Sequence, residues 1–222
     1  MAILKIRDLH YGYGSGKDRH EVLRGLNASF EQGQFYAVTG KSGAGKSTLL
    51  SLLSALTLPQ QGEILFEGTP TSALDPLEYR RRCVAVVYQD FALFPLLNVT
   101  ENIMYPMELC GVPQEKALAD ARALAAQVGL GEELLSRYPS AISGGEQQRV
   151  AIARGMAMDR RLILADEPTG NLDSENRDQI VQLLLEAAHR DNRCVIVVTH
   201  DPDVAAKADR VLLMKDGVLA AR

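Results

Sequence analysis

The chain has 222 residues, of which 46% are hydrophobic and 23% are charged, and its formal net charge is −4 at pH 7. This composition is typical of a globular chain with a substantial core, and it argues against a polybasic surface for nucleic acid or anionic lipid. No stretch approaches the roughly 18 to 20 uninterrupted apolar residues that cross a bilayer, and the N-terminal residues are charged where a secretory signal is apolar. If the protein works at a membrane, we expect another chain to supply the membrane part.

The cysteines are odd in number, lack CxxC spacing and lie in apolar segments. This pattern argues against a disulfide framework or a zinc site. We predict three buried thiols in a reducing cytoplasm, at Cys83, Cys110 and Cys194.

The N-terminal part of the chain predicts a small antiparallel flap. Residues 3–9 alternate apolar and polar side chains, and residues 63–68 form a short apolar run bounded by glycine. Both patterns are typical of antiparallel strands. We expect this flap to pack on a parallel core.

That core is indicated by apolar runs that read as strands buried on both faces, at 35–40, 83–89, 162–167 and 194–200. A helical stretch at 45–56 follows the first run, and another at 174–190 precedes the last. The runs end in glycine, glutamine, an acid and histidine. Because ligands of open α/β sheets bind beyond the carboxyl ends of the strands, these residues point to one shared crevice.

Strand-like runs stop between Asp90 and Ser143, and residues 114–130 read as an amphipathic helix rich in alanine and leucine. We predict a single α/β domain over 1–222. Residues 1–89 and 159–222 form its core, and residues 90–158 form an inserted helical subdomain.

The sequence GKSGAGKST, between the first buried run and its helix, indicates a phosphate-binding loop. Glycines let consecutive backbone N–H groups face an anion, and the helix N-terminus adds its positive end. Lys46 can then reach terminal phosphates and Ser47 can ligate Mg²⁺; the alternative is a glycine-rich turn capped by Ser47. Lys41 adds a charge without an assigned role. The candidate nucleotide-binding residues of the loop are Gly40, Lys41, Ser42, Gly43, Ala44, Gly45, Lys46, Ser47 and Thr48.

Two adjacent acids, Asp166 and Glu167, end the third buried run. In phosphate-loop enzymes an aspartate at such a strand end holds Mg²⁺, and a neighbouring acid can position or deprotonate the attacking water. Asp166 fits the first role and Glu167 the second, since a divalent cation beside one acid relieves their repulsion. Taken alone, the pair also fits a strand that ends in a polar turn.

A second anion-binding helix start is indicated by SGGEQQRVAIARG, which begins at Ser143. The alternative is an ordinary helix cap. The helical subdomain separates this segment from Lys46, so the two sites imply either two ligands or one ligand shared between two copies of the chain. We favour sharing. The candidate residues are Ser143, Gly144, Gly145 and Glu146.

The motifs GKSGAGKST, Gln89, ISGGEQQRV, LILADE, NLD and His200 together resemble, in order and spacing, the ATP-binding subunits of ABC transporters, over essentially the whole chain. This resemblance implies an ATPase that works as a head-to-tail homodimer with two ATP molecules, each held by the loop of one chain and residues 143–146 of the other. It implies that Tyr13 stacks on adenine, with Tyr11 as a rival. It also implies that Gln89 links Mg²⁺ to the membrane partner, that Asp173 lies at the dimer contact, and that His200 contacts the γ-phosphate.

The motifs ISGGEQQRVAIARG and LADEPTGNLDS look like the subgroup of lipoprotein-releasing, macrolide-exporting, antimicrobial-peptide-resistance and cell-division ATPases. The resemblance implies membrane partner subunits and a location on the cytoplasmic face of the cell membrane. Residues 91–109 then either hold a groove for a partner's coupling helix or form core of the helical subdomain. The chain ends about 20 residues after His200, which favours release or export over importers that carry a C-terminal regulatory domain.

Two other functions are weighed against transport. A soluble ABC-type ATPase acting on DNA or ribosomes would carry long coiled coils or two fused cassettes, whereas this chain has one phosphate loop and no heptads. We therefore expect no nucleic-acid partner. A small-molecule kinase would leave the segment at Ser143 and His200 unexplained.

Overall fold

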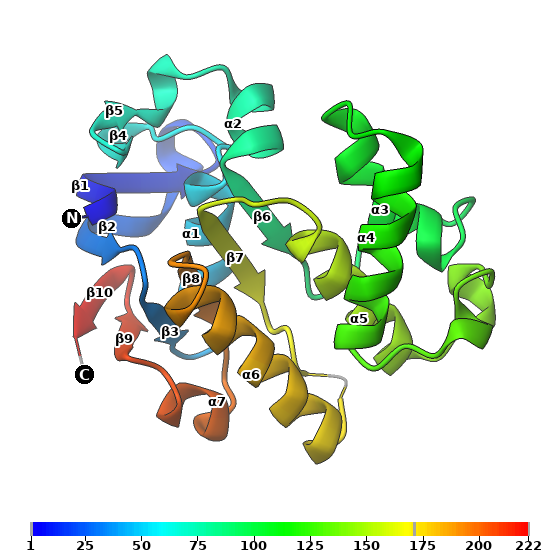
Figure 1. Cartoon of the computed structure of the whole chain (residues 1–222). Helices are drawn as coiled ribbons and strands as arrows, with labels where there is room; N and C mark the ends of the chain where they lie inside the picture. Colours follow the sequence, from blue (N-terminus) through cyan, green and yellow to red (C-terminus); the bar gives the residue numbers. More distant parts are fainter. Residues whose placement is uncertain (1, 171, 222) are drawn as a thin grey trace.

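The computed structural model describes residues 2–170 and 172–221, which form two sheets and a group of helices at one end of the molecule (Figure 1). The larger sheet has the strand order β10-β9-β3-β8-β7-β6. Its strands are β3 (Phe35–Thr39), β6 (Val84–Val87), β7 (Leu162–Asp166), β8 (Cys194–Val198), β9 (Arg210–Lys215) and β10 (Val218–Ala221).

The parallel core predicted from the four apolar runs is confirmed. Strand β3 pairs in parallel with β8, β8 with β7, and β7 with β6. The register places Val38 beside Val198, and Asp166 is also opposite Val198, so the ends of three strands meet at one edge. Strand β9 adds a further parallel strand beside β3, and β10 pairs antiparallel with β9; neither was predicted from the sequence.

The smaller sheet is antiparallel and has the order β2-β1-β4-β5. It contains β1 (Ala2–Tyr13), β2 (His20–Glu31), β4 (Gln61–Phe66) and β5 (Thr69–Pro70). The predicted flap is therefore confirmed, with β1 and β4 paired antiparallel. Strand β2, which pairs with the other edge of β1, was not predicted.

Helix α1 (Lys46–Leu53) packs in the core between the flap and the parallel sheet. Its buried leucines share a cluster with Ile64 of β4 and Val38 of β3. On the opposite face of the sheet, α6 (Ser174–His189) buries Ile180, Val181 and Leu184 against β8 and neighbouring strands. The remaining short helices are α2 (Pro76–Arg82), α7 (Pro202–Ala206) and the 3₁₀ helices at Gly16–Asp18, Thr71–Ala73, Glu132–Leu134 and Pro139–Ala141.

The helical group consists of α3 (Val99–Leu109), α4 (Gln114–Gln127) and α5 (Gly144–Met156), with α3 and α4 farthest from the flap (Figure 1). Helix α5 also buries Val150 and Ile152 in the cluster that covers β6 and β7. At Gly155 an added Cβ would lie 2.9 Å from Val87 Cγ2, so this helix is seated directly on β6. The boundary predicted at residue 158 stays a prediction, because α5 packs on both parts.

The cysteines lie in two environments. Cys194 is buried in β8, where burial raises the pKa of its thiol. Cys83 and Cys110 are half-buried, at the start of the outermost strand β6 and at the end of α3. The expectation of buried thiols is therefore correct for Cys194 alone; the other two lie at ends of elements, where core packing is incomplete.

Candidate functional site

The glycine-rich loop joins the end of β3 to the start of α1, as the sequence predicted. Two of its glycines are required by close approaches. A Cβ at Gly40 would lie 2.3 Å from the carbonyl oxygen of Met214, and Gly45 has a φ of 102° with Val22 and Leu23 only 3.0 Å from its Cβ position. The loop is thus held against β9 on one side and β2 on the other. This packing fixes the curl of the loop, and a curled glycine-rich loop before a helix is the backbone form that binds anions.

Lys46, the first residue of α1, reaches back across the loop. Its Nζ donates hydrogen bonds to the carbonyl oxygens of Gly40 (2.8 Å) and Lys41 (3.1 Å). The ammonium group is therefore positioned at the mouth of the cradle, where it can pair with a phosphate. A glycine-rich loop at a helix start, together with a lysine, is a donor set suited to a nucleotide polyphosphate.

Ser47 and Asp166 meet where α1 begins and β7 ends. Ser47 Oγ donates a 2.9 Å hydrogen bond to Asp166 Oδ2. Burial raises the pKa of Asp166; the Ser47 hydrogen bond and Lys46 oppose this effect, and the nearby Glu167 adds to it. A hydroxyl and a carboxylate in contact beside a phosphate cradle are the oxygen ligands that Mg²⁺ accepts.

In the described part of the chain, no three His, Cys, Asp or Glu side chains converge to hold a metal by themselves. Proteins bind Mg²⁺ through one or two side chains together with substrate phosphates and water, and Ser47 and Asp166 supply two such oxygen ligands. The residues therefore fit a magnesium nucleotide.

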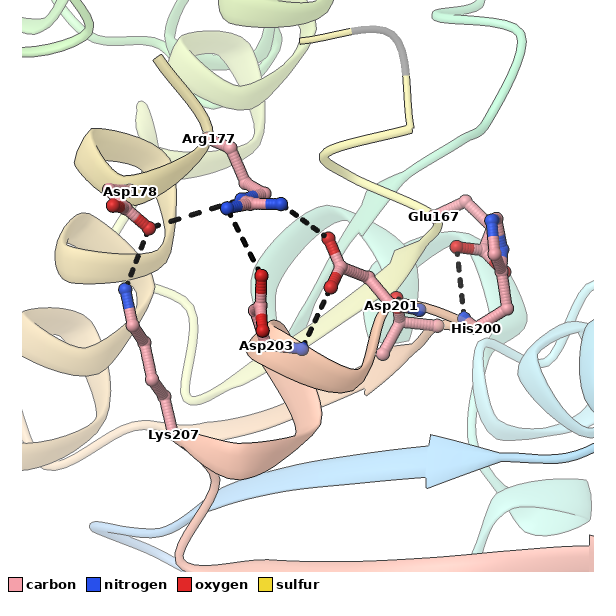
Figure 2. A network of polar contacts seen from close by, with 8 residues as sticks. Glu167, Arg177, Asp178, His200, Asp201, Asp203 and Lys207 are labelled. Atoms are coloured by element: carbon pink, nitrogen blue, oxygen red, sulfur yellow. Dashed lines mark hydrogen bonds and ion pairs between the residues drawn. The ribbon is translucent and has the colours of Figure 1, made fainter. Parts of the chain in front are cut away.

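Glu167 follows β7 in a left-handed conformation, with a φ of 48°. Its backbone N–H donates to Val198 O at 2.9 Å, which holds this uncommon geometry in place. The carboxylate faces His200, whose Nδ1 lies 2.8 Å from Oε1 and whose backbone N–H lies 3.3 Å from Oε2 (Figure 2). The Glu167 side chain is 12% exposed and the His200 side chain is 76% exposed, so a largely buried carboxylate is paired with an exposed histidine. The two strand ends thus supply a candidate base and its partner.

One pocket of about 540 Å³ is lined by Gln89, Asp166, Glu167, His200 and all the loop residues from Gly40 to Thr48 except Lys41 and Ala44. Tyr13 also lines it, and its hydroxyl is 3.2 Å from Thr48 Oγ1. The Tyr13 side chain is largely exposed, whereas Tyr11 is half-buried and meets the ring of Tyr13 edge-on at 5.2 Å. Tyr13 is therefore the better placed of the two for stacking on a base.

Two lining residues, His20 and Val22, were not predicted as part of the site. They begin β2 and come near the loop only because β2 folds back along β1, and no local motif marks them. Lys41 and Ala44 do not line this pocket; they line a neighbouring cavity of about 640 Å³, which also contacts Ser42 and Gly43 of the loop. Lys41 still contributes to the site through its backbone, because its carbonyl oxygen accepts a hydrogen bond from Lys46 Nζ.

The segment at Ser143 forms a second, separate structure. Ser143 caps α5 in a capping box: its Oγ accepts from Glu146 N at 3.3 Å, and its own N–H donates to Glu146 Oε2 at 2.6 Å. This hydrogen bond from the Ser143 backbone lowers the pKa of Glu146. Asp173 caps α6 and accepts from Asn176 N at 2.9 Å; the preceding Asn171 of the NLD motif lies outside the described residues.

Among the described residues that line the nucleotide pocket, none belongs to 143–146, and Asp173 is absent as well. One chain therefore brings together the loop, Tyr13, Gln89, the two acids and His200, and leaves the second anion-binding segment on another part of its surface. This is the arrangement expected if the segment serves a site in another copy of the chain.

A parallel sheet with a glycine-rich loop, a lysine and serine at the following helix, and an acid at the end of the next strand but one in the sheet defines a P-loop nucleotide-hydrolysing protein. Residues 23–170 match the family model described as ABC transporter. The chain therefore belongs to the ABC transporter family and is an ATP-hydrolysing, ATP-binding subunit.

Several relatives match nearly the whole chain. An uncharacterized ABC transporter ATP-binding protein of Mycobacterium tuberculosis (strain ATCC 25618 / H37Rv) is 41% identical and covers 98% of this chain and 88% of its own length. The lipoprotein-releasing system ATP-binding protein LolD of Paramagnetospirillum magneticum (strain ATCC 700264 / AMB-1) is 41% identical over 97% of this chain and 96% of its own. The chain also matches 34% of the length of the pyoverdine export ATP-binding/permease protein PvdT of Pseudomonas aeruginosa, at 40% identity.

A solved structure agrees with the fold. The dimeric post-hydrolysis state of the ATP-binding cassette MJ0796, bound to ADP and Pi, has a TM-score of 0.92 and 34% identity, with 99% of this chain and 97% of that chain covered. The predicted fold class and transport ATPase activity are confirmed, and these comparisons give no support to the DNA or ribosome alternative.

Proposed function

We propose that two copies of this chain form a head-to-tail dimer, bind two Mg²⁺–ATP molecules at shared sites, and drive membrane subunits from the cytoplasmic face of the cell membrane. One observation carries this proposal: the loop, the paired acids and His200 line one pocket, while residues 143–146 and Asp173 do not. Dimeric cassettes among the similar solved structures support it. Within residues 2–170 and 172–221, none of the helices combines the length and apolar character needed to cross a bilayer.

In this proposal the residues of one chain bind the base and phosphates, hold the magnesium ion and activate the attacking water. Tyr13 stacks on the adenine, and the loop N–H groups and Lys46 hold the phosphates. Ser47, Asp166 and Gln89 hold Mg²⁺, which when bound neutralises charge on the phosphate oxygens. Glu167 accepts the proton of the attacking water, and His200 Nδ1 orients the Glu167 carboxylate until the γ-phosphate is in place.

The partner chain supplies the remaining contacts to the nucleotide. Ser143, Gly144 and Gly145 present a helix start to the phosphates across the interface, and Glu146 accepts from a ribose hydroxyl. Asp173 lies at the contact between the chains. The site is complete only after closure, so hydrolysis is linked to dimerisation.

Co-purification from membranes, combined with Mg²⁺-dependent ATP hydrolysis by the purified chain, tests this function. We expect the protein in the membrane fraction together with an integral membrane subunit. Recovery with ribosomes or DNA alone would contradict the proposal.

The proposed docking site for the membrane subunit is a groove of about 500 Å³ between α2, β6, α3 and α5. Leu77, Phe94 and Leu109 line it and are exposed although apolar. The segment that follows Gln89 forms one wall, where Arg154 of α5 donates to the carbonyl oxygens of Phe91 (2.9 Å) and Ala92 (2.7 Å). Both residues have left-handed φ values, 63° and 46°, so this turn is held in a strained form beside the magnesium-site glutamine.

Leu109→Asp is expected to weaken association with the membrane subunit while the isolated cassette keeps its ATP hydrolysis. The groove is lined by arginines as well as apolar side chains, but an aspartate at position 109 removes apolar contact area and must lose its water when a partner docks. We expect a loss of about 10-fold or more in affinity. The control is Leu118→Asp, a comparably exposed leucine of α4 that does not line the groove. Equal pull-down by both variants would exclude this groove as the docking site.

Asp166→Asn is expected to raise the melting temperature of the nucleotide-free chain at pH 7 and to abolish Mg²⁺-dependent hydrolysis. Burial raises the pKa of Asp166, and an acid whose pKa is higher in the folded chain loses its stabilising contribution as the pH rises through that value. The ionised carboxylate therefore destabilises the metal-free fold at neutral pH, and the difference should vanish below about pH 4, where aspartate is protonated in both states. Thermal melts of Asp166→Asn and the wild type at pH 7 and below about pH 4 check this difference, with Asp120→Asn of α4 as the control.

A further inference from the structure

Helix α6 begins directly after Asp173, and its fourth residue, Arg177, points toward the segment that carries His200 (Figure 2). The backbone N–H of Arg177 donates to Asp173 O at 2.9 Å, within the first turn of the helix. Its guanidinium reaches the start of α7, where Nη1 lies 3.3 Å from Asp201 Oδ2 and Nη2 lies 3.2 Å from Asp203 Oδ2. One residue thus connects the turn at Asp173 with the residue that follows His200.

Asp201 is fixed in several ways at once. Its Oδ1 accepts from Asp203 N at 2.8 Å as the cap of α7, and its own N–H donates to Thr199 Oγ1 at 3.0 Å. Thr199 is fully buried and donates through its N–H to Val38 O of β3. The backbone on one side of His200 is therefore tied to the sheet, and on the other side to Arg177 of α6.

We propose that Arg177 is a positioning residue that couples Asp173 to His200. When a second chain closes on Asp173, a shift of the α6 N-terminus moves the guanidinium, and through Asp201 it sets the position of His200 toward Glu167 and the γ-phosphate. This inference rests on the proposed function, since it assigns the internal link between the dimer contact and the hydrolytic pair. The ion pairs are partly exposed and add little to stability, so their effect lies in geometry.

The same two helices carry a matched control. Lys207 Nζ of the α7 C-cap lies 2.8 Å from Asp178 Oδ1, so this pair also joins α6 to α7 (Figure 2). The pair contacts neither Asp201 nor His200. Asp178 also lies 3.9 Å from Arg177 Nε, and Lys207→Met leaves both of these residues in place. Loss of the Lys207 pair therefore removes a contact between the helices without touching the segment at His200.

The test compares Arg177→Met with Lys207→Met in the full chain, by steady-state MgATP hydrolysis and its dependence on ATP concentration. For Arg177→Met we expect kcat to fall by about 10- to 100-fold, as for a misplaced catalytic group, and the Hill coefficient to fall toward about 1. ADP affinity of the monomer and the melting temperature should stay near those of the wild type. Lys207→Met should match the wild type in all four measurements, and Arg177→Lys should recover part of kcat.

Equal kcat and Hill coefficients for Arg177→Met and Lys207→Met would overturn the inference. If Arg177→Met does not fold, Asp201→Asn serves instead, because asparagine keeps the cap of α7 and removes the charge that faces Arg177. Failure of the proposed function is distinguishable, since the wild-type chain itself would then show no cooperative, Mg²⁺-dependent hydrolysis.

Discussion

Glu167→Gln is expected to bind ATP with nearly unchanged affinity and to hydrolyse it about 10²- to 10⁴-fold more slowly than the wild type, the usual contribution of a general base. Glutamine has the shape of glutamate and can still accept a hydrogen bond from His200 Nδ1, which lies 2.8 Å from the carboxylate. It cannot take a proton from water at neutral pH. Phosphate release under single turnover separates the loss of chemistry from a loss of binding.

The matched control is Glu175→Gln, which removes an exposed acid from the first turn of α6, outside the nucleotide pocket. We expect this variant to turn over like the wild type. Near wild-type turnover by Glu167→Gln would remove Glu167 as the base and leave water activation to another group.

Mixing a Lys46→Ala chain with a Ser143→Arg chain is expected to restore hydrolysis that each chain lacks alone. In the proposed dimer every site takes Lys46 from one chain and Ser143 from the other, so each variant homodimer should have a defect in both sites. In a heterodimer one site carries both defects and the other carries none. At equal mixing about half of the dimers are heterodimers, so recovery reaches at most about a quarter of the wild-type rate.

Hydrolysis by the mixture is measured against the two separate variants at equal total protein. Arginine at position 143 also removes the cap of α5, which costs about 1 kcal/mol, so the melting temperature of that variant is measured alongside. Full MgATP hydrolysis by either variant alone would refute shared sites.

The candidate site could be predicted largely from the sequence because its polar residues lie directly after the ends of buried strands. Parallel strands bring Gly40, Asp166 and His200 to one edge of the sheet, whatever their separation along the chain. Geometry favours the magnesium role of Ser47 and Asp166 over the alternatives, since the two side chains bond to each other, which neither a simple cap nor a polar turn requires.

Other features needed tertiary information. Strand β2 contains Gly25 and pairs with β1 through several register shifts, so its alternation is irregular. Strand β9 lies between β3 and the edge strand β10, and most of its side chains are exposed or half-buried. The side chain of Lys41 lines the neighbouring cavity because of the loop's curl, which residue spacing does not encode. The ion pair of Arg177 with Asp201 joins residues that are 24 positions apart on different helices, and no motif marks it.

The mass of Glu167→Gln in MgATP, measured by light scattering together with the amount of bound nucleotide, tests the central claim of shared sites most directly. If the sites are shared, we expect a particle of two chains with two ATP molecules, and a monomer that still binds ATP when Ser143→Arg is added. A Glu167→Gln chain that stays monomeric while saturated with MgATP would refute shared sites.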